Sequence, residues 1–224
     1  MGGSQGFGFD SKILHFLSLE ISKLIAVGHS VGLVLGGGNL VRGSGFAELS
    51  DDRVVGDHMG MLATIMNALA VQSSLERHGV YTRVMSAISV DQICEPYIRR
   101  RAVRHLEKKR VCIFAAGTGN PYFTTDTAAT LRATEMECQA IFKGTQVEGI
   151  YDKDTKLHSD AIRYDTVSYD LILQKNLRVM DASAIALARD NKMPIVVFSL
   201  KKVGGMKEVI QGHGRFTLVE PSLN

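Results

Sequence analysis

Residues 31–42 read VGLVLGGGNLVR, an apolar run that stops at three consecutive glycines. The run at 31–35 is short and β-rich, which predicts a strand. The glycines at 36–38 let backbone N–H groups approach an anion closely, and Arg42 adds a charge suited to phosphate. The stretch lacks the Lys-Ser/Thr of a P-loop and the G-x-G-x-x-G spacing of a dinucleotide site. Taken alone, it fits a phosphate-binding loop and a tight strand-to-helix turn equally well.

Helical and strand-like segments alternate along the rest of the chain. Asp10 is a candidate N-cap for a helix that ends at Gly28, and a second apolar helical stripe ends at Gly79. Further helices are predicted at 96–109, 125–137, 181–191 and 205–211, and strands at 81–85, 111–115, 139–143, 195–199 and 216–219. Such alternation predicts the α/β class: a three-layer α/β/α sandwich around a mostly parallel sheet.

Composition limits the functional classes. The 224 residues suffice for one sizeable α/β domain or two tightly joined lobes. A formal charge of +3 is too mild to indicate nucleic acid or a membrane as partner. The basic run RRRAVRHLEKKR at 99–110 has no interleaved aromatics, so it favours a solvated helix face over a nucleic-acid patch, with an anionic effector site as a third possibility.

The cysteines and the apolar runs indicate a compartment. Cys94, Cys112 and Cys138 are odd in number and widely spaced, which is typical of free thiols in a reducing environment. The sequence has no secretory signal pattern and no apolar run near the ~18 residues of a membrane span. A cytoplasmic protein without membrane contact is predicted.

Three polar, glycine-bearing segments directly follow predicted strands. They are GGGNLVR at 36–42, GTGNPYFTTD at 117–126 and KGTQVEGIYDKD at 143–154. Because ligands of open α/β sheets bind beyond the carboxyl ends of the strands, these loops predict a site that grips more than one phosphate-bearing group.

The aspartates and histidines indicate a functional site less strongly than the three strand-end loops do. Asp57, Asp126 and Asp181 lie at or near predicted helix starts, where capping is the commoner role, although each also lies near a strand-end loop. The seven histidines show no metal-ligand spacing, and His58 in GDHMG is more typical of a packed side chain than of a ligand. No protein-held metal site is predicted.

Several motifs together resemble one family. They are GGGNLVRG at 36–43, VVGDHMGMLAT at 54–64, SAI at 86–88, AAGTGNPYFTTDTAA at 115–129, GT-x-V-x-G-I-Y-x-x-D from Gly144, VMD at 179–181 and ARD-x-K-x-PI from Ala188. With them the chain resembles the bacterial uridylate kinase (UMP kinase) family of the amino acid kinase superfamily. The resemblance implies a single domain over 1–224, with a UMP-binding lobe at about 1–143 and an ATP-binding lobe at about 144–224.

The resemblance also implies an activity and its residues. Family members transfer the γ-phosphoryl of Mg-ATP to UMP, giving UDP and ADP for pyrimidine biosynthesis, with Mg²⁺ and no organic cofactor. Catalytic roles would fall to Arg42, Asp126 and Asp181. UMP would be bound by Gly37, Asp57, Thr118, Gly119, Asn120, Pro121, Tyr122, Phe123, Thr124 and Thr125, and ATP by Gly38, Arg42, Thr145, Tyr151 and Asp154. Family members are homohexamers, commonly inhibited by UTP and often activated by GTP, so these nucleotides are the effectors that the resemblance implies.

The start of the chain departs from the family pattern. Family members begin with a strand ending in a motif like KLSGE, whose lysine reaches the phosphates, and this chain is expected to lack that strand and that charge. Two alternatives therefore stay open. One is a nucleotide-binding protein with little or no catalysis, acting as sensor or store. The other is a related kinase of a carboxylate, carbamate or isoprenoid phosphate.

Overall fold

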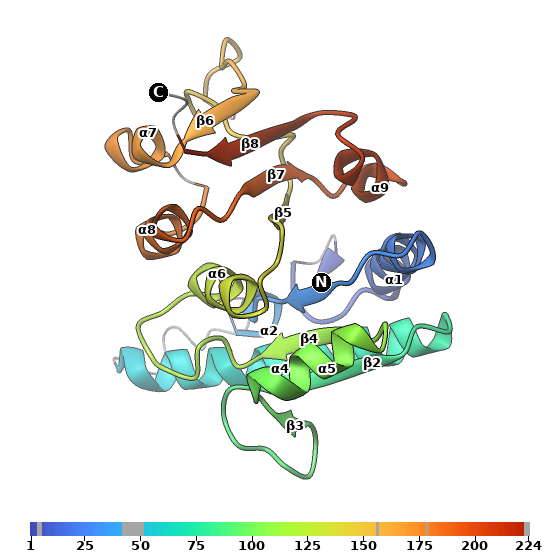
Figure 1. Ribbon diagram of the computed structural model, residues 1–224. Coiled ribbons are helices and arrows are strands. Elements are labelled where there is room, and N and C mark those ends of the chain that lie inside the picture. Colours follow the sequence, from blue (N-terminus) through green and yellow to red (C-terminus); the bar gives the residue numbers. More distant parts are fainter. Residues whose placement is uncertain (4–5, 42–51, 156, 178, 222–224) are drawn as a thin grey trace. The chain divides into compact units, whose positions relative to one another are not determined.

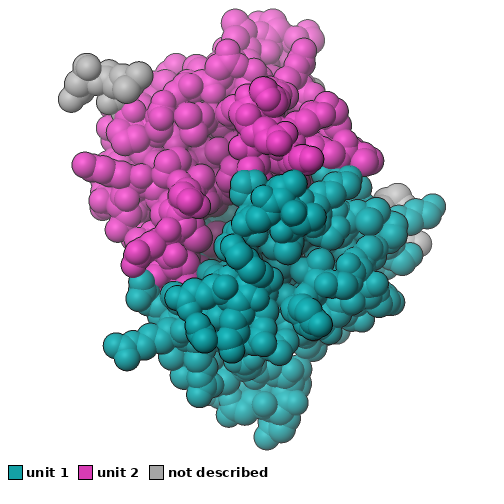
Figure 2. Space-filling model, turned by 45° about the vertical axis from the view of Figure 1, so that its right-hand side comes forward, with its two compact units in different colours: residues 1–128 teal, residues 129–224 magenta. Residues whose placement is uncertain are grey.

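The computed structural model describes residues 1–3, 6–41, 52–155, 157–177 and 179–221. It divides into two compact units, Met1–Ala128 and Ala129–Asn224 (Figure 2). The division falls inside helix α6 (Thr125–Glu135), whereas the sequence analysis places the lobe boundary near residue 143. Each unit contains its own cluster of buried apolar side chains.

Unit 1 is built on a four-stranded parallel sheet of order β1-β4-β2-β3 (Figure 1). Its strands are β1 (Gly32–Val34), β2 (Thr82–Ser86), β3 (Glu95–Pro96) and β4 (Val111–Ala115). Helix α4 (Arg53–Arg77) connects β1 to β2, and α5 (Arg99–Glu107) connects β3 to β4. Parallel pairing brings the carboxyl ends of β1 and β4 to the same edge, where ligands of α/β proteins bind.

Helices cover both faces of the unit 1 sheet. Alternate residues of β4, such as Val111 and Ile113, belong to the core that α1 (Ser11–Ala26) and α4 complete. On the opposite face Cys112 Sγ donates to the carbonyl of Ala102 in α5 at 3.7 Å. The period of two along a fully buried strand therefore produces a three-layer arrangement within this unit.

The predicted cap Asp10 and the predicted stops at Gly28 and Gly79 are confirmed, while the start of α4 at Asp52 was not predicted. Asp10 caps α1 by accepting from the Lys12 N–H at 2.8 Å, and Asp52 caps α4 by accepting from the Val54 N–H at 2.8 Å. Gly28 and Gly79 follow these helices with φ of 96° and 75°, a left-handed conformation that favours glycine. A short helix, α2 (Gly38–Val41), follows β1.

Helix α4 is also long and apolar enough, by length and composition, to cross a membrane. Its residues Ile65, Ala68, Val71 and Leu75 are buried in the unit 1 core. A core helix of a globular unit passes the same test, and this buried face accounts for the apolar composition of α4.

Unit 2 contains a second four-stranded sheet of order β5-β7-β8-β6. Its strands are β5 (Ile141–Thr145), β6 (Thr166–Ser168), β7 (Ile195–Ser199) and β8 (Phe216–Glu220). The β5–β7 and β6–β8 pairs are parallel, and the β7–β8 pair is antiparallel. Strand β6 and helix α7 (Tyr169–Gln174) have no counterpart among the predicted elements.

The unit 2 sheet is likewise covered on both faces. Ile195 and Val197 belong to the core with α7 and α8 (Ala182–Asp190), while Val196 and Phe198 pack with Val209 of α9 (Gly205–Ile210). The predicted α/β class, the mostly parallel pairing and the helices on both faces are confirmed. The described strands pair as two sheets, one per unit, where the sequence analysis expects one.

Candidate active site

The glycine loop after β1 lies directly against helix α4. A Cβ placed on Gly37 would be 2.7 Å from the Gly60 carbonyl oxygen and 2.9 Å from the Ala63 Cβ. Real Cβ atoms do not approach a backbone oxygen this closely, so a side chain here would displace the loop. Gly37 thus permits the contact between the loop and the helix.

A pair of asparagines holds this loop in place. Asn67 of α4 is fully buried, and its Nδ2 donates to the Gly36 carbonyl and to Asn39 Oδ1, each at 2.6 Å. Asn39 Nδ2 donates back to Asn67 Oδ1 at 3.0 Å and to the Gly8 carbonyl at 2.8 Å, and the Gly8 N–H donates to the Asn39 carbonyl at 2.9 Å. Because these groups satisfy one another, the pair fixes the glycine loop against α4 and against the glycine-rich N-terminal segment.

The loop after β4 is also anchored to α4. Ala116 and Tyr122 have left-handed backbones, with φ of 62° and 71°. The Ala116 N–H donates to Thr64 Oγ1 at 2.7 Å, and the Tyr122 N–H donates to Asp57 Oδ2 at 2.7 Å. Non-glycine residues keep this conformation where surrounding contacts fix it, so two side chains of α4 set the course of the loop.

Asp57 does not cap helix α4, although capping is the commoner role for an aspartate near a helix start. Capping of α4 belongs to Asp52, and Asp57 instead accepts from the 118–125 loop. The Arg53 guanidinium lies 4.7 Å from the centre of the Tyr122 ring. The expectation that Asp57 caps a helix is wrong, while its predicted proximity to a strand-end loop is confirmed.

The residues predicted to bind UMP all lie in unit 1. Gly37, Asp57 and the 118–125 loop follow or flank the carboxyl ends of β1 and β4, and a Cβ on Gly36 would lie 3.7 Å from Thr125 Oγ1. Tyr122 and Phe123 are exposed by 62% and 52%, so their rings are available to a ligand. Gly38 is the first residue of α2, and Arg42 lies outside the described residues.

The other two aspartates are placed in different units. Asp126 lies in the first turn of α6, where Thr124 Oγ1 accepts from the N–H groups of Asp126 and Thr127. Asp181 is the N-cap of α8 and accepts from the Ala184 N–H at 2.9 Å, which confirms the capping expectation for this residue. Their catalytic roles remain predictions.

Gly37→Ala is expected to lower the free energy of unfolding by about 1–3 kcal/mol, the usual cost of overpacking. Gly56→Ala is the control. Gly56 lies in helix α4, and a Cβ placed there would meet no atom within 4 Å. Alanine within a helix should stabilise by about 0.5–1 kcal/mol relative to glycine. Chemical denaturation checks both, and equal effects of the two substitutions would contradict the close contact at Gly37.

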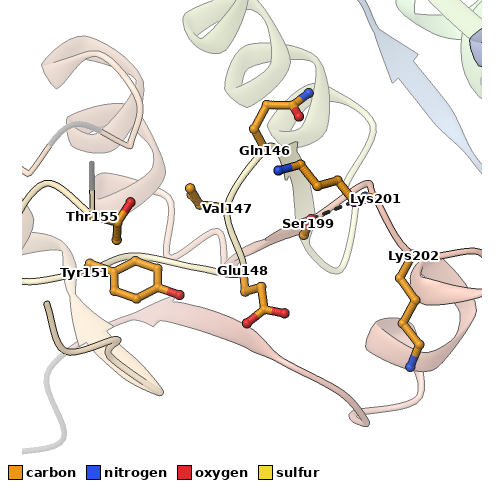
Figure 3. A pocket seen from close by; sticks show the side chains of 8 residues that line it. All are labelled: Gln146, Val147, Glu148, Tyr151, Thr155, Ser199, Lys201 and Lys202. Atoms are coloured by element: carbon orange, nitrogen blue, oxygen red, sulfur yellow. Dashed lines mark hydrogen bonds between the residues drawn. The ribbon is translucent and has the colours of Figure 1, made fainter. Parts of the chain in front are cut away.

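Unit 2 contains a cavity of about 460 Å³ at the carboxyl ends of β5 and β7 (Figure 3). It is lined by Gln146, Val147, Glu148, Tyr151, Thr155, Ser199, Lys201 and Lys202. Of the residues predicted to bind ATP, Tyr151 lines this cavity, while Thr145 and Asp154 are the sequence neighbours of lining residues. The Thr145 hydroxyl donates to the Val147 carbonyl at 2.6 Å and accepts from the Val147 N–H at 3.0 Å, so it shapes the lining loop.

Two lysines and one glutamate are the charged residues of the lining, and Glu148 pairs with Arg215 at 3.0 Å. Lys202 Nζ pairs with Glu208 of α9 at 2.6 Å, and Lys201 forms no ion pair within the described part of the chain. In Figure 3 the Lys201 side chain extends toward Gln146, and Lys202 points elsewhere. A cavity lined by an aromatic ring and, at another point, by an available ammonium group suits a ligand that combines a base with phosphates. The sequence analysis missed both lysines, although they directly follow a predicted strand.

Three or more metal-ligating side chains do not gather at one point in the part of the chain that the structure describes. Among the described residues there is no group of three or more His, Cys, Asp or Glu side chains that could hold a metal ion. Mg²⁺ that arrives with a nucleotide needs none, because it is held by phosphate oxygens, waters and one or two carboxylates.

The three cysteine thiols are expected to be poor nucleophiles. All three are free, and burial raises the pKa of the Cys112 thiol to about 12. Burial also raises the pKa values of Cys94 and Cys138 above the ordinary range. Thiols with raised pKa values are protonated near neutral pH, which argues against a cysteine nucleophile.

Comparison with known proteins agrees with this architecture. The profile of the amino acid kinase family matches residues 1–199. The uridylate kinase of Cereibacter sphaeroides is 61% identical over 218 residues, covering 97% of this chain and 89% of that relative. The chain belongs to the bacterial uridylate kinases of the amino acid kinase family.

Solved structures of the family agree with this assignment. The UMP kinase from Bacillus anthracis superposes with a TM-score of 0.93 at 37% identity, covering 97% of this chain and 90% of that one. The UMP kinase from Ureaplasma parvum gives a TM-score of 0.90 at 39% identity, with 95% and 90% covered. The predicted family and fold are thereby confirmed.

Proposed function

We propose that this chain transfers the γ-phosphoryl group of ATP to UMP, giving UDP and ADP in pyrimidine nucleotide biosynthesis. The observation that carries the proposal is the contact of Asp57 with the loop after β4, in a chain 61% identical to a uridylate kinase. That contact joins two of the motifs by which the chain resembles the family. Relatives named uridylate kinase favour this activity over a binding protein without catalysis and over a kinase of another small molecule.

UMP binds in unit 1 under this proposal. The Asp57 carboxylate accepts hydrogen bonds from the ribose hydroxyls, and the 118–125 loop encloses the nucleotide. Gly37 exposes backbone N–H groups to the acceptor phosphate, and the asparagine pair keeps them in position. Backbone donors that are fixed before the ligand arrives need no reorganisation during the reaction.

ATP binds in unit 2 under this proposal. Tyr151 contacts the base, and Thr145 and Asp154 shape the surrounding loop. Gly38 and Arg42 keep the role that the family resemblance implies for them, contacts with phosphates. Mg²⁺ neutralises charge on the phosphate oxygens when it is bound with ATP. Phosphoryl transfer asks for positioning and charge neutralisation more than for a general base, so Arg42, Asp126 and Asp181 would organise the transfer without covalent chemistry.

Assembly, regulation and location belong to the same proposal. A homohexamer that UTP inhibits and GTP activates, working in the cytoplasm, follows from the family resemblance. Analytical ultracentrifugation with and without UTP or GTP tests the assembly, and initial rates with each nucleotide test the regulation.

The substrate is tested with a panel of acceptors. ADP formation would be followed in a coupled assay with UMP, CMP, acetylglutamate and carbamate in turn. We expect turnover with UMP and little with the others. Turnover of a non-nucleotide with none of UMP would overturn the proposal in favour of a related kinase. Tight UMP binding by calorimetry with no turnover would favour a sensor or store.

Lys201→Met tests the nucleotide cavity of unit 2. Removing an ammonium that meets the phosphates should raise the KM for ATP by about tenfold, since a hydrogen bond to a charged group contributes about 1.5–3 kcal/mol. Lys192→Met is the control, because Lys192 is an exposed lysine of the same unit that does not line the cavity. Steady-state kinetics with varied ATP measures the KM of both variants. An unchanged KM for Lys201→Met would place the phosphates away from Lys201.

A further inference from the structure

Two histidines join the first helix to the end of the core helix, away from both nucleotide loops. His78 Nε2 lies 3.1 Å from His15 Nδ1, with ring centroids 4.9 Å apart and ring planes inclined by 50°. His15 projects from α1 and is exposed, and His78 is the C-cap of α4 and is partly buried. Both residues belong to unit 1.

The tautomer of His78 follows from its second contact. His78 Nδ1 lies 2.7 Å from the Ser74 carbonyl oxygen. A carbonyl oxygen can only accept, so Nδ1 carries the proton and the neutral ring presents a lone pair at Nε2. Metal-binding histidines are commonly oriented in this way, by donating their other ring N–H to a carbonyl or carboxylate.

The separation of the two nitrogens also suits a shared cation. Two imidazole nitrogens that bind one tetrahedral ion at about 2.0–2.1 Å lie roughly 3.3 Å apart. The pair at 3.1 Å is close to that spacing. In the hydrogen-bonded pair the His15 Nδ1–H donates to the lone pair of His78 Nε2. To bind a cation, His15 takes the tautomer with its proton on Nε2, which frees the lone pair at Nδ1. A modest rotation of this exposed ring then directs both lone pairs to one point beside the line between the two nitrogens.

We propose that His15 and His78 bind one divalent transition-metal ion of the imidazole-preferring class, such as Zn²⁺, Ni²⁺ or Cu²⁺. The described residues provide no cluster of three or more ligands, so water completes the coordination and the ion exchanges readily. Mg²⁺ prefers oxygen ligands and is not expected here. A bound ion would link α1 to the end of α4 and stabilise unit 1 by mass action.

Calorimetry on the untagged full chain tests the site, with ZnCl₂ and NiCl₂ as titrants and MgCl₂ as the comparison. We expect one Zn²⁺ or Ni²⁺ per chain and a rise in melting temperature with either ion, and neither effect with Mg²⁺. His78→Gln and His15→Gln should each weaken binding more than tenfold, since loss of even an outer-shell partner commonly costs 10–100-fold.

His213→Gln is the matched control, because His213 is an exposed histidine of unit 2. It should bind Zn²⁺ as the unmodified chain does. Unaltered binding by the His15→Gln/His78→Gln double variant would overturn the proposal, because the ion would then be held elsewhere. An unmodified chain that binds neither Zn²⁺ nor Ni²⁺ would also overturn it and leave a hydrogen-bonded histidine pair.

Discussion

Asp57→Asn is expected to weaken UMP binding by about 10–100-fold, the equivalent of the 1.5–3 kcal/mol of a hydrogen bond to a charged group. Asparagine keeps an oxygen that can accept from the Tyr122 N–H, so the loop contact at 2.7 Å in the native chain can persist. What disappears is the negative charge proposed to accept from the ribose hydroxyls. Calorimetric titration with UMP measures the change.

Asp52→Asn is the control for this experiment. Asp52 caps the same helix by accepting from the Val54 N–H, and asparagine is an equally good N-cap. Both substitutions remove one carboxylate from the start of α4, so they change the net charge equally. If Asp52→Asn and Asp57→Asn weakened UMP binding to the same extent, general electrostatics would explain the result and a specific role for Asp57 would be lost.

Asn67→Leu is expected to lower the free energy of unfolding by about 3 kcal/mol and to displace the glycine loop. The substitution removes three hydrogen bonds, one to the Gly36 carbonyl and two shared with Asn39, and each contributes about 0.5–1.5 kcal/mol. UMP turnover should fall at least as steeply as stability, because the loop that faces the phosphate is no longer fixed. Chemical denaturation and initial rates measure the two effects.

A double-mutant cycle separates the asparagine pair from simple loss of packing. Asn39→Leu alone should also be destabilising, but Asn39→Leu/Asn67→Leu should cost clearly less than the sum of the two, because both halves of the pair are then removed. Asn191→Leu, at the exposed end of α8, should be close to neutral. Strict additivity of the two unit 1 substitutions would contradict the reciprocal hydrogen bonds.

The sequence was sufficient for elements with strong local signals. The N-cap Asp10, the apolar stripe of α4 and the β-rich run of β4 each report on residues a few positions apart, and all three elements were predicted. Strand β6 and helix α7 were missed because one follows the other directly, at Ser168 and Tyr169, with no glycine or proline between them to mark a boundary. Strand β1 and helix α9 are equally short, but glycines next to each of them supply that mark. The antiparallel direction of β8 is a long-range property that no local pattern records.

The residues of the candidate site also differ in whether a pattern in the sequence could predict them. Strand-end position and family resemblance pointed to Gly37, Asp57 and the 118–125 loop, and the structure brings these segments together within unit 1. The contribution of Asn67 was not predicted, because an asparagine inside a helix carries no signal until its partner Asn39 is known. Its one clue is an amide side chain among the largely apolar buried residues of α4, where Thr64 and Ser74 are the other polar members.

The central claim is that this chain moves a phosphoryl group from ATP to UMP. The most direct measurement uses ATP labelled with ³²P at the γ position, incubated with the chain, Mg²⁺ and UMP, followed by separation of the nucleotides. The account predicts that the label appears in UDP in step with the ADP formed, and that Asp57→Asn reduces this transfer while Asp52→Asn does not. Label that stays in ATP, or is released as inorganic phosphate while UMP is unchanged, would contradict it.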